Sequence, residues 1–197
     1  MTTDSTKLFE LIIAASLTNN FVFTRYLGLC IFFGVSKKME TALGMGITFT
    51  AVMMISAALS WVVYNLVMLP LDITFLKIIV FIGIIAAFVQ ASDTIMRKMS
   101  PGLYYKLGIY LALISTNCII LAVPLINADE QYSFLESLAF GFGSGIGFAL
   151  ALIIMASIRE KIEVADVPAP FKGMPMAFIV TSMIALAFMG LSGLITI

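Results

Sequence analysis

The sequence predicts an all-α integral membrane protein with six transmembrane helices, arranged as two inverted repeats of three helices each. Of its 197 residues, 61% are hydrophobic and 11% are charged, whereas a soluble domain is about 45–50% apolar and about a quarter charged. The mean hydropathy is +1.11. A chain of this size cannot hide so much apolar surface from water, so we expect lipid to be its solvent.

Six apolar segments are long enough to cross a bilayer, whose core of about 30 Å requires about 20 helical residues. Turns that carry charge or proline separate them. Because unpaired backbone groups are costly inside lipid, we expect helices rather than an open sheet. The predicted spans are Leu11–Phe33, Ala42–Leu69, Ile73–Ala91, Leu107–Ile126, Phe134–Ile158 and Met174–Ile197. Together they form a single membrane domain, residues 1–197.

The distribution of charge predicts the orientation of these spans. The first, third and fifth loops are basic, whereas the second and fourth contain Asp72, Asp129 and Glu130 and no Lys or Arg. The positive-inside rule therefore places the odd loops in the cytoplasm and both termini on the outer face. The net charge is zero and no basic block occurs, which argues against a nucleic-acid partner.

A short internal similarity indicates inverted halves, about 1–98 and 99–197. Glu40 precedes Gly44 and Gly46 at the start of the second span, and Glu136 stands in a similar place before the glycines of the fifth span. Three spans separate the two copies, so the halves would have opposite orientations, as in membrane proteins with a site near the midplane. Chance agreement between two glycine-rich helix starts is the alternative.

Polar residues cluster inside the first and fourth spans, where they are costly and typically mark a functional site. Cys118 lies near the middle of the fourth span, whereas Cys30 would lie at the cytoplasmic end of an unbroken first helix. The two can approach each other only if one or both helices are broken or re-entrant. We expect the breaks where amide side chains can pair freed backbone groups, at Asn19-Asn20 and Thr116-Asn117.

Three interpretations of Cys30 and Cys118 remain open from the residues alone. Each can be an inert, buried thiol, the usual state of a cysteine in a membrane. A disulfide is disfavoured by depth in the lipid and by the cytoplasmic side of Cys30. The third interpretation is thiolate ligation of a metal cluster. An iron–sulfur cluster takes four cysteines, and the chain has two, so a cluster would have to be shared with a second chain.

Other residues narrow the chemistry. The chain has no histidine, which excludes a Ser-His-Asp triad and a histidine metal site, so we expect electron or ion movement rather than hydrolysis. Glu40, Asp93 and Glu136 are candidates for handling a cation, although each can instead be an interfacial charge or a helix cap. Two pairs of glycines with GxxxG spacing, within 141–147, predict close helix packing.

Several sequence blocks carry a resemblance to a known family. They are Asn19-Asn20-Phe21-Val22, Leu27-Gly28-Leu29-Cys30, Val35–Ala42, Thr116-Asn117-Cys118, Val164–Phe171 and Leu186–Gly190. On these blocks the chain resembles, over nearly its whole length, the A-type subunits (RnfA) of Rnf (Rsx) electron-transport complexes. It is less similar to the E-type subunits of the Na⁺-translocating NADH:quinone reductase. Ile31 stands where a proline often follows the cysteine, and Ser115 where a threonine is common.

The resemblance implies a partner and a cofactor. In this family the chain pairs with a homologous membrane subunit of opposite orientation, RnfE, and each contributes two cysteines to one [2Fe–2S] cluster at their interface. Carried over to this sequence, the ligands are Cys30 and Cys118. The residues expected to support them are Gly28, Asn19, Asn20, Thr116 and Asn117.

The resemblance also implies a function. The chain would be a membrane subunit of an ion-translocating ferredoxin:NAD⁺ oxidoreductase in a prokaryotic cytoplasmic (inner) membrane, together with RnfB, RnfC, RnfD, RnfE and RnfG. It would relay electrons across the membrane, coupled to Na⁺ or H⁺ transport, without being catalytic alone. The alternatives are the equivalent subunit of the Na⁺-translocating quinone reductase and an ion or solute transporter that has no cluster.

Overall fold

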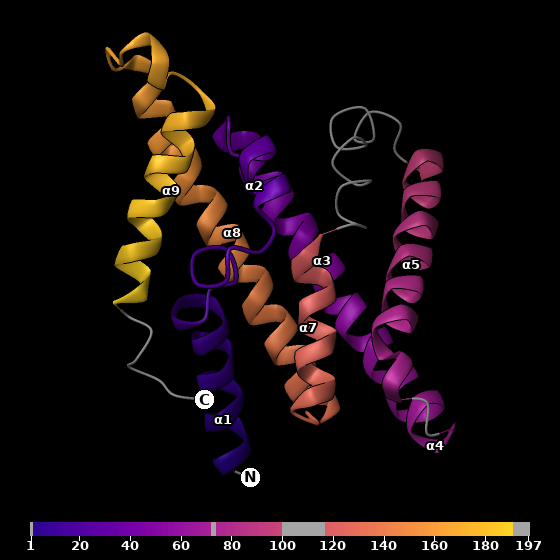
Figure 1. The fold of residues 1–197 in the computed structure, drawn as a ribbon. Helices are drawn as coiled ribbons and strands as arrows, with labels where there is room; N and C mark the ends of the chain where they lie inside the picture. The colour runs from indigo at the N-terminus through magenta and orange to yellow at the C-terminus, as the bar shows by residue number, and fades with distance from the viewer. Residues whose placement is uncertain (1, 72–73, 100–116, 191–197) are drawn as a thin grey trace.

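The computed structural model describes residues 2–71, 74–99 and 117–190, and within these ranges the regular elements are all helical, as expected (Figure 1). The longer helices lie side by side, with α5 on one flank and α9 on the other. In chain order the elements are α1 (Thr2–Ile13), the π-helix η1 (Ala14–Thr18), α2 (Leu29–Val35), α3 (Met39–Val63), the π-helix η2 (Tyr64–Met68), α4 (Leu69–Leu71), the 3₁₀ helix η3 (Thr74–Leu76), α5 (Lys77–Met99), α7 (Cys118–Asp129), α8 (Phe134–Val164), the 3₁₀ helix η4 (Ala169–Phe171) and α9 (Met174–Met189).

The helices α3 and α8 form the most extensive helix pair and cross in opposite directions at the centre of the molecule (Figure 1). Small residues allow the crossing. A Cβ added to Gly145 would lie 2.8 Å from Cα of Thr50, and one added to Gly46 would lie 2.8 Å from Cβ of Ala149. A Cβ added to Gly141 would lie 3.0 Å from Cβ of Ala57 in α3. The backbones therefore approach too closely for larger side chains.

The other glycine pair of α8 faces a different neighbour. A Cβ on Gly143 would lie 2.8 Å from the carbonyl oxygen of Ile12 in α1, and one on Gly147 would lie 2.9 Å from that of Ser16 in η1. The prediction of close packing at both GxxxG pairs is confirmed. Gly141 and Gly145 pack against α3, and Gly143 and Gly147 pack against α1 and η1.

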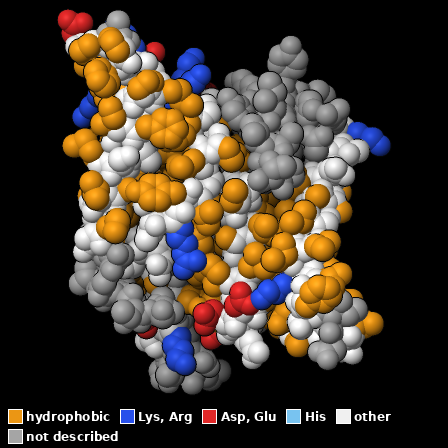
Figure 2. All heavy atoms as spheres, viewed as in Figure 1, with side chains coloured by type: hydrophobic (Ala, Val, Ile, Leu, Met, Phe, Trp, Pro, Cys, Tyr) orange, Lys and Arg blue, Asp and Glu red, His pale blue; other side chains and the backbone are white. Residues whose placement is uncertain are grey.

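Among the described residues, three helical stretches are long and apolar enough to cross a membrane: Met39–Leu71, Thr74–Ala91 and Phe134–Val164. They match the predicted second, third and fifth spans. The apolar helix α9 matches the described part of the predicted sixth span. Its outward face exposes Phe178, Met183 and Leu186, and apolar side chains cover much of the face seen in Figure 2. Apolar surface of this extent is expected to contact lipid.

The predicted first and fourth spans are not continuous helices. Along the first, the chain forms α1 and η1, leaves the helix at residues 19–28, and then forms the short α2. Along the fourth, α7 begins only at Cys118, after an extended Asn117 with φ −75° and ψ 126°. The predicted break in the first helix is confirmed, and helix does not run through Asn117. Residues 107–116 of the fourth span lie outside the described ranges.

Candidate functional site

The break in the first span is held by the side chain of Asn20. Its Nδ2 donates to the carbonyl oxygens of Ser16, at 3.1 Å, and Gly147, at 2.8 Å. Its Oδ1 accepts from the backbone N–H of Val22 at 3.1 Å. The residue is 1% exposed. A buried amide thus pairs the backbone groups released where the helix stops, the role expected for the Asn19-Asn20 pair.

The rest of this break is a folded loop at mid-height of the molecule (Figure 1). The N–H of Asn19 donates to the carbonyl of Ala14 at 2.7 Å as the π-helix η1 ends. Tyr26 and Gly28 have positive φ angles, 54° and 75°, and they return the chain into α2. Between them and η1, the exposed Arg25 places its guanidinium carbon 5.7 Å from the ring centroid of Phe21.

The second break has a similar cap with one difference. The Oδ1 of Asn117 accepts from the N–H of Ile119 at 2.9 Å and so caps α7. The side chain is 2% exposed. Its Nδ2, however, is buried with no hydrogen-bond partner among the described residues. A buried donor without a partner is costly, so an additional acceptor next to this amide would be stabilising. The candidate Thr116 lies outside the described residues.

The two breaks meet at Gly28. A Cβ on this residue would lie 2.6 Å from Cδ1 of Ile119 and 3.2 Å from Oδ1 of Asn117. Gly28 stands two residues before Cys30, and Asn117 and Ile119 are the two neighbours of Cys118. The fold therefore brings the two cysteine-bearing segments into contact across about 90 residues of sequence, through a glycine with a left-handed φ of 75° that only glycine adopts readily.

Both cysteines lie in the first turn of the helix that follows a break. Cys30 is the second residue of α2, and Cys118 is the first residue of α7. Both thiols are free and both side chains are exposed on the isolated chain. The described part of this chain therefore does not bury the two thiols, and no disulfide joins them.

Within the described ranges, no three His, Cys, Asp or Glu side chains gather into a group that could hold a metal ion. The described residues alone thus do not complete a metal site. Two exposed thiols on touching segments, with an unpartnered amide donor beside one of them, fit half of a cluster site whose remaining ligands come from elsewhere, since iron–sulfur clusters take four thiolates and accept hydrogen bonds at sulfur.

The carboxylates considered for a cation path take different positions. The carboxylate of Glu136 caps α8, with Oε2 accepting from the N–H and hydroxyl of Ser133 at 2.9 and 2.8 Å. This is the capping role that the sequence left open for it. Glu40 is exposed in the first turn of α3. The side chain of Asp93 lies outside the described residues.

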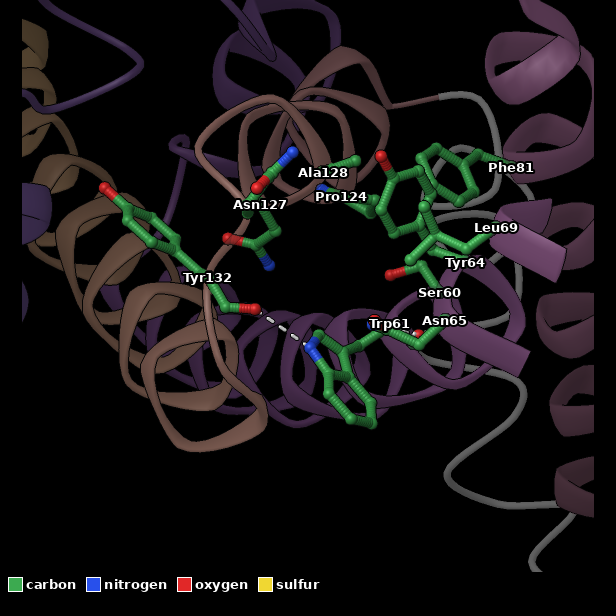
Figure 3. A pocket seen from close by; sticks show the side chains of 11 residues that line it. Ser60, Trp61, Tyr64, Asn65, Leu69, Phe81, Pro124, Asn127, Ala128 and Tyr132 are labelled. Carbon is green, nitrogen blue, oxygen red and sulfur yellow. Dashed lines mark hydrogen bonds between the residues drawn. The ribbon is translucent and has the colours of Figure 1, made fainter. Parts of the chain in front are cut away.

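A cavity of about 250 Å³ with both polar and apolar lining residues lies where the π-helix η2 faces α7. Figure 3 shows Pro124 and Asn127 on one side of it and Ser60, Trp61 and Tyr64 on the other. Asn127 is 5% exposed, and neither its side-chain oxygen nor its nitrogen has a hydrogen-bond partner in the described part of the chain. Sequence reasoning missed this cavity; an asparagine within the apolar α7 is the one signal that pointed to it.

The described residues that line this cavity include no charged side chain. Tyr132 contributes its backbone carbonyl, which accepts from Nε1 of Trp61 at 2.9 Å. Burial raises the pKa of the Tyr132 phenol, and the carboxylates of Glu130 and Glu136 raise it further. The phenol therefore stays neutral at physiological pH, and the described lining of the cavity presents polar groups without charge.

These observations define a class: a helical membrane protein in which two cysteine-bearing segments contact each other at the starts of two helices. The comparison with known proteins gives the family. Residues 8–195 match the Rnf-Nqr family, described as Rnf-Nqr subunit, membrane protein, and the chain belongs to it.

Similar proteins cover almost the whole chain. It is 54% identical over 187 residues to RnfA of Clostridium ljungdahlii, a component of the proton-translocating ferredoxin:NAD(+) oxidoreductase complex, and the match covers 95% of this chain and 97% of that protein. It is 49% identical, with the same coverage, to the corresponding component of the ion-translocating oxidoreductase complex of Sodalis glossinidius. The protein of the same name from Vibrio cholerae is 48% identical over 190 residues, 96% of this chain and 98% of the other.

Proposed function

We propose that this chain is the RnfA component of an ion-translocating ferredoxin:NAD⁺ oxidoreductase of the Rnf type. In this proposal Cys30 and Cys118 are two of the four thiolate ligands of a [2Fe–2S] cluster, and the homologous membrane protein RnfE supplies the other two. The observation that supports the proposal is the contact of Gly28 with Ile119 and Asn117, because Gly28 stands two residues before Cys30 and the other two residues flank Cys118, and both cysteines are exposed.

The character of this surface supports a protein partner. The loop that precedes Cys30 lies at mid-height of the molecule (Figure 1) and includes an exposed arginine, Arg25. Charged and polar side chains at bilayer depth face protein rather than lipid, because lipid cannot solvate them. A second membrane protein that covers this surface would remove Arg25, Cys30 and Cys118 from contact with lipid.

Each residue of the site has a distinct part in the proposal. A [2Fe–2S] cluster supplies reversible one-electron transfer at a depth that neither aqueous side reaches directly. Cys30 and Cys118 would hold it, and Asn20 and Gly28 fix the segments that carry them. The Nδ2 of Asn117, a buried donor, would be able to donate a hydrogen bond to sulfur, and Arg25 would supply positive charge to a centre whose thiolates make it anionic.

The finer topology belongs to the same proposal. Six spans form inverted halves with both termini on the outer face, and the odd loops face the cytoplasm of a prokaryotic cell. Two features support this arrangement. The helices α3 and α8, one from each half, run in opposite directions (Figure 1). The basic residues Lys37, Lys38 and Arg159 gather around one pocket.

Ion coupling follows from the burial of charge. An electron added at a site remote from water changes the local electrostatic energy strongly, so it can shift an equilibrium between conformations open to opposite sides. Na⁺ or H⁺ movement, with RnfB, RnfC, RnfD, RnfE and RnfG as partners, completes the proposal. The names of the similar proteins favour this complex over the quinone reductase, and the exposed thiols favour it over a transporter without a cluster.

The test is electron paramagnetic resonance of the reduced, purified complex, with iron content and protein composition measured on the same samples. We expect Cys30→Ser and Cys118→Ser each to abolish the signal of one [2Fe–2S] centre while the complex stays assembled. Ser182→Ala, at an exposed position of α9, is the control and should leave the signal intact. An assembled Cys118→Ser complex that keeps every iron–sulfur signal would falsify the assignment.

A further inference from the structure

A second pocket, of about 530 Å³, opens where α8 ends and α9 begins. Its wall carries four basic side chains and one acidic side chain. They are Lys37, Lys38, Arg159, Lys172 and Glu163. Apolar side chains, among them Ile162 and Met176, complete the wall. The cations come from three separate segments: the turn between α2 and α3, the last turns of α8, and the residue before Gly173 at the start of α9.

The turn that carries Lys37 and Lys38 is fixed in place. Arg159 donates from Nη1 to the carbonyl of Phe33 at 2.8 Å and to the hydroxyl of Ser36 at 3.1 Å. Ser36 is fully buried. On the other side of the turn, Thr41 donates to the carbonyl of Lys38 at 2.8 Å. Both lysines are exposed, yet their backbone is held by α8 and α3, so the basic pocket is a built feature of the fold.

Nothing in the described chain neutralises these cations fully. The one ion pair among the described residues, Lys77 with Asp129, lies outside this pocket. Glu160, close in sequence, accepts from the N–H of Met39 at 3.0 Å and does not line the pocket, and neither does Asp166. Four cations facing one carboxylate in a concave site repel one another, and an anion that entered would relieve this repulsion.

The surroundings of the pocket indicate which anion. The pocket ends at Met176 and Ala177, and the outward face of α9 continues from there with Phe178, Met183 and Leu186, which are 52%, 67% and 69% exposed. In a membrane protein this face contacts acyl chains. A molecule with a phosphate at the level of the lysines and hydrocarbon along α9 would satisfy both features, which a soluble anion would not.

We propose that this pocket binds the phosphate headgroup of an anionic phospholipid, with the acyl chains lying along α9. Basic pockets between membrane helices at the cytoplasmic surface bind such headgroups, and the basic loops of this chain are the ones assigned to the cytoplasm by the positive-inside rule. The site is separate from the cysteines and does not depend on a cluster.

The experiment uses the purified complex in detergent, stripped of lipid and titrated with cardiolipin, phosphatidylglycerol or phosphatidylcholine, with bound lipid counted by native mass spectrometry. We expect the two anionic lipids to bind and phosphatidylcholine to bind at least tenfold more weakly. Lys172→Ala should weaken binding about fivefold, and the double variant Lys37→Ala/Lys38→Ala about twenty-fold or more, since each basic side chain near an anionic surface contributes by a similar factor.

Two controls keep the result specific. Lys161→Ala removes an exposed charge from the same end of α8 outside the pocket and should leave binding within twofold. Lys37→Arg/Lys38→Arg should keep it, which separates lost charge from misfolding. The iron–sulfur signals of all these variants should be unchanged, so this proposal and the cluster assignment fail independently.

Three outcomes would overturn the proposal. Binding of phosphatidylcholine as tight as that of the anionic lipids would show that the pocket does not select for negative charge. Displacement of the lipid by millimolar inorganic phosphate would show a site for a soluble anion. Cross-links from Lys37 or Lys172 to carboxylates of a neighbouring protein of the complex, with no lipid bound in the intact assembly, would show that an acidic protein segment occupies the pocket.

Discussion

The two breaks of this molecule use the same residue in different ways. In each, an asparagine Oδ1 accepts from the N–H two residues ahead, Val22 for Asn20 and Ile119 for Asn117. The Nδ2 of Asn20 also donates to two carbonyls, whereas that of Asn117 has no partner among the described residues. In the first break the side-chain amide is therefore fully used by backbone groups of the chain. In the second, a buried donor next to Cys118 in sequence is left without an acceptor in the described part of the chain.

The largest effect that would sharpen this comparison is expected at Asn20. Asn20→Ala removes three hydrogen bonds and leaves the buried carbonyl of Gly147 without its side-chain donor, so we expect a loss of about 3 kcal/mol in the free energy of unfolding. Thermal denaturation of the purified complex, followed through this chain, would measure it. The control is Asn65→Ala, whose amide makes one bond, to the carbonyl of Trp61. Equal losses for the two variants would contradict a special role for Asn20.

The next largest loss of stability is expected at Gly147, the residue of α8 that accepts a hydrogen bond from Asn20. Gly147→Ala would place a Cβ 2.9 Å from the carbonyl oxygen of Ser16 and 3.0 Å from its Cα. These are backbone atoms, so η1 must move away from α8, and we expect a destabilisation of about 2 kcal/mol. The same thermal measurement checks it.

Gly44→Ala is the matched control for this variant. A Cβ at Gly44 meets nothing within 4 Å, so the substitution should be neutral or should stabilise α3 by up to about 1 kcal/mol. If Gly147→Ala were as harmless as Gly44→Ala, the contact of η1 with α8 would not be what fixes the first break.

The sequence predicted much of this architecture because lipid imposes simple rules. Apolar length located three long helices, and costly amides at Asn19-Asn20 and Asn117 located the breaks. The difference between the two amides was not predictable, since it depends on the carbonyl of Gly147, which lies 127 residues from Asn20. The cavity around Asn127 was not predicted for the same reason. Its lining residues come from η2 and α7, which only the tertiary structure places together.

The smallest change in stability, and the most specific test of the comparison, is expected at Asn117. Asn117→Ser keeps an oxygen that can cap α7 but removes the amide donor. We expect stability to change by less than about 1 kcal/mol, because serine caps helices about as well as asparagine. If the Nδ2 donates to a sulfur of the proposed cluster, its loss should lower the midpoint potential. The expected shift is about 60 mV, the one-electron equivalent of a tenfold change in equilibrium.

A redox titration followed by electron paramagnetic resonance would measure this shift, with Asn65→Ser as the control that should leave the potential unchanged. Asn117→Asp is a second test. This variant keeps the capping acceptor and replaces the donor with negative charge, so it should lower the midpoint potential further than Asn117→Ser does. An unchanged potential in both Asn117 variants would mean that the unpartnered amide does not face the redox centre. The asymmetry between the two breaks would then have to be explained by a contact with the protein partner instead.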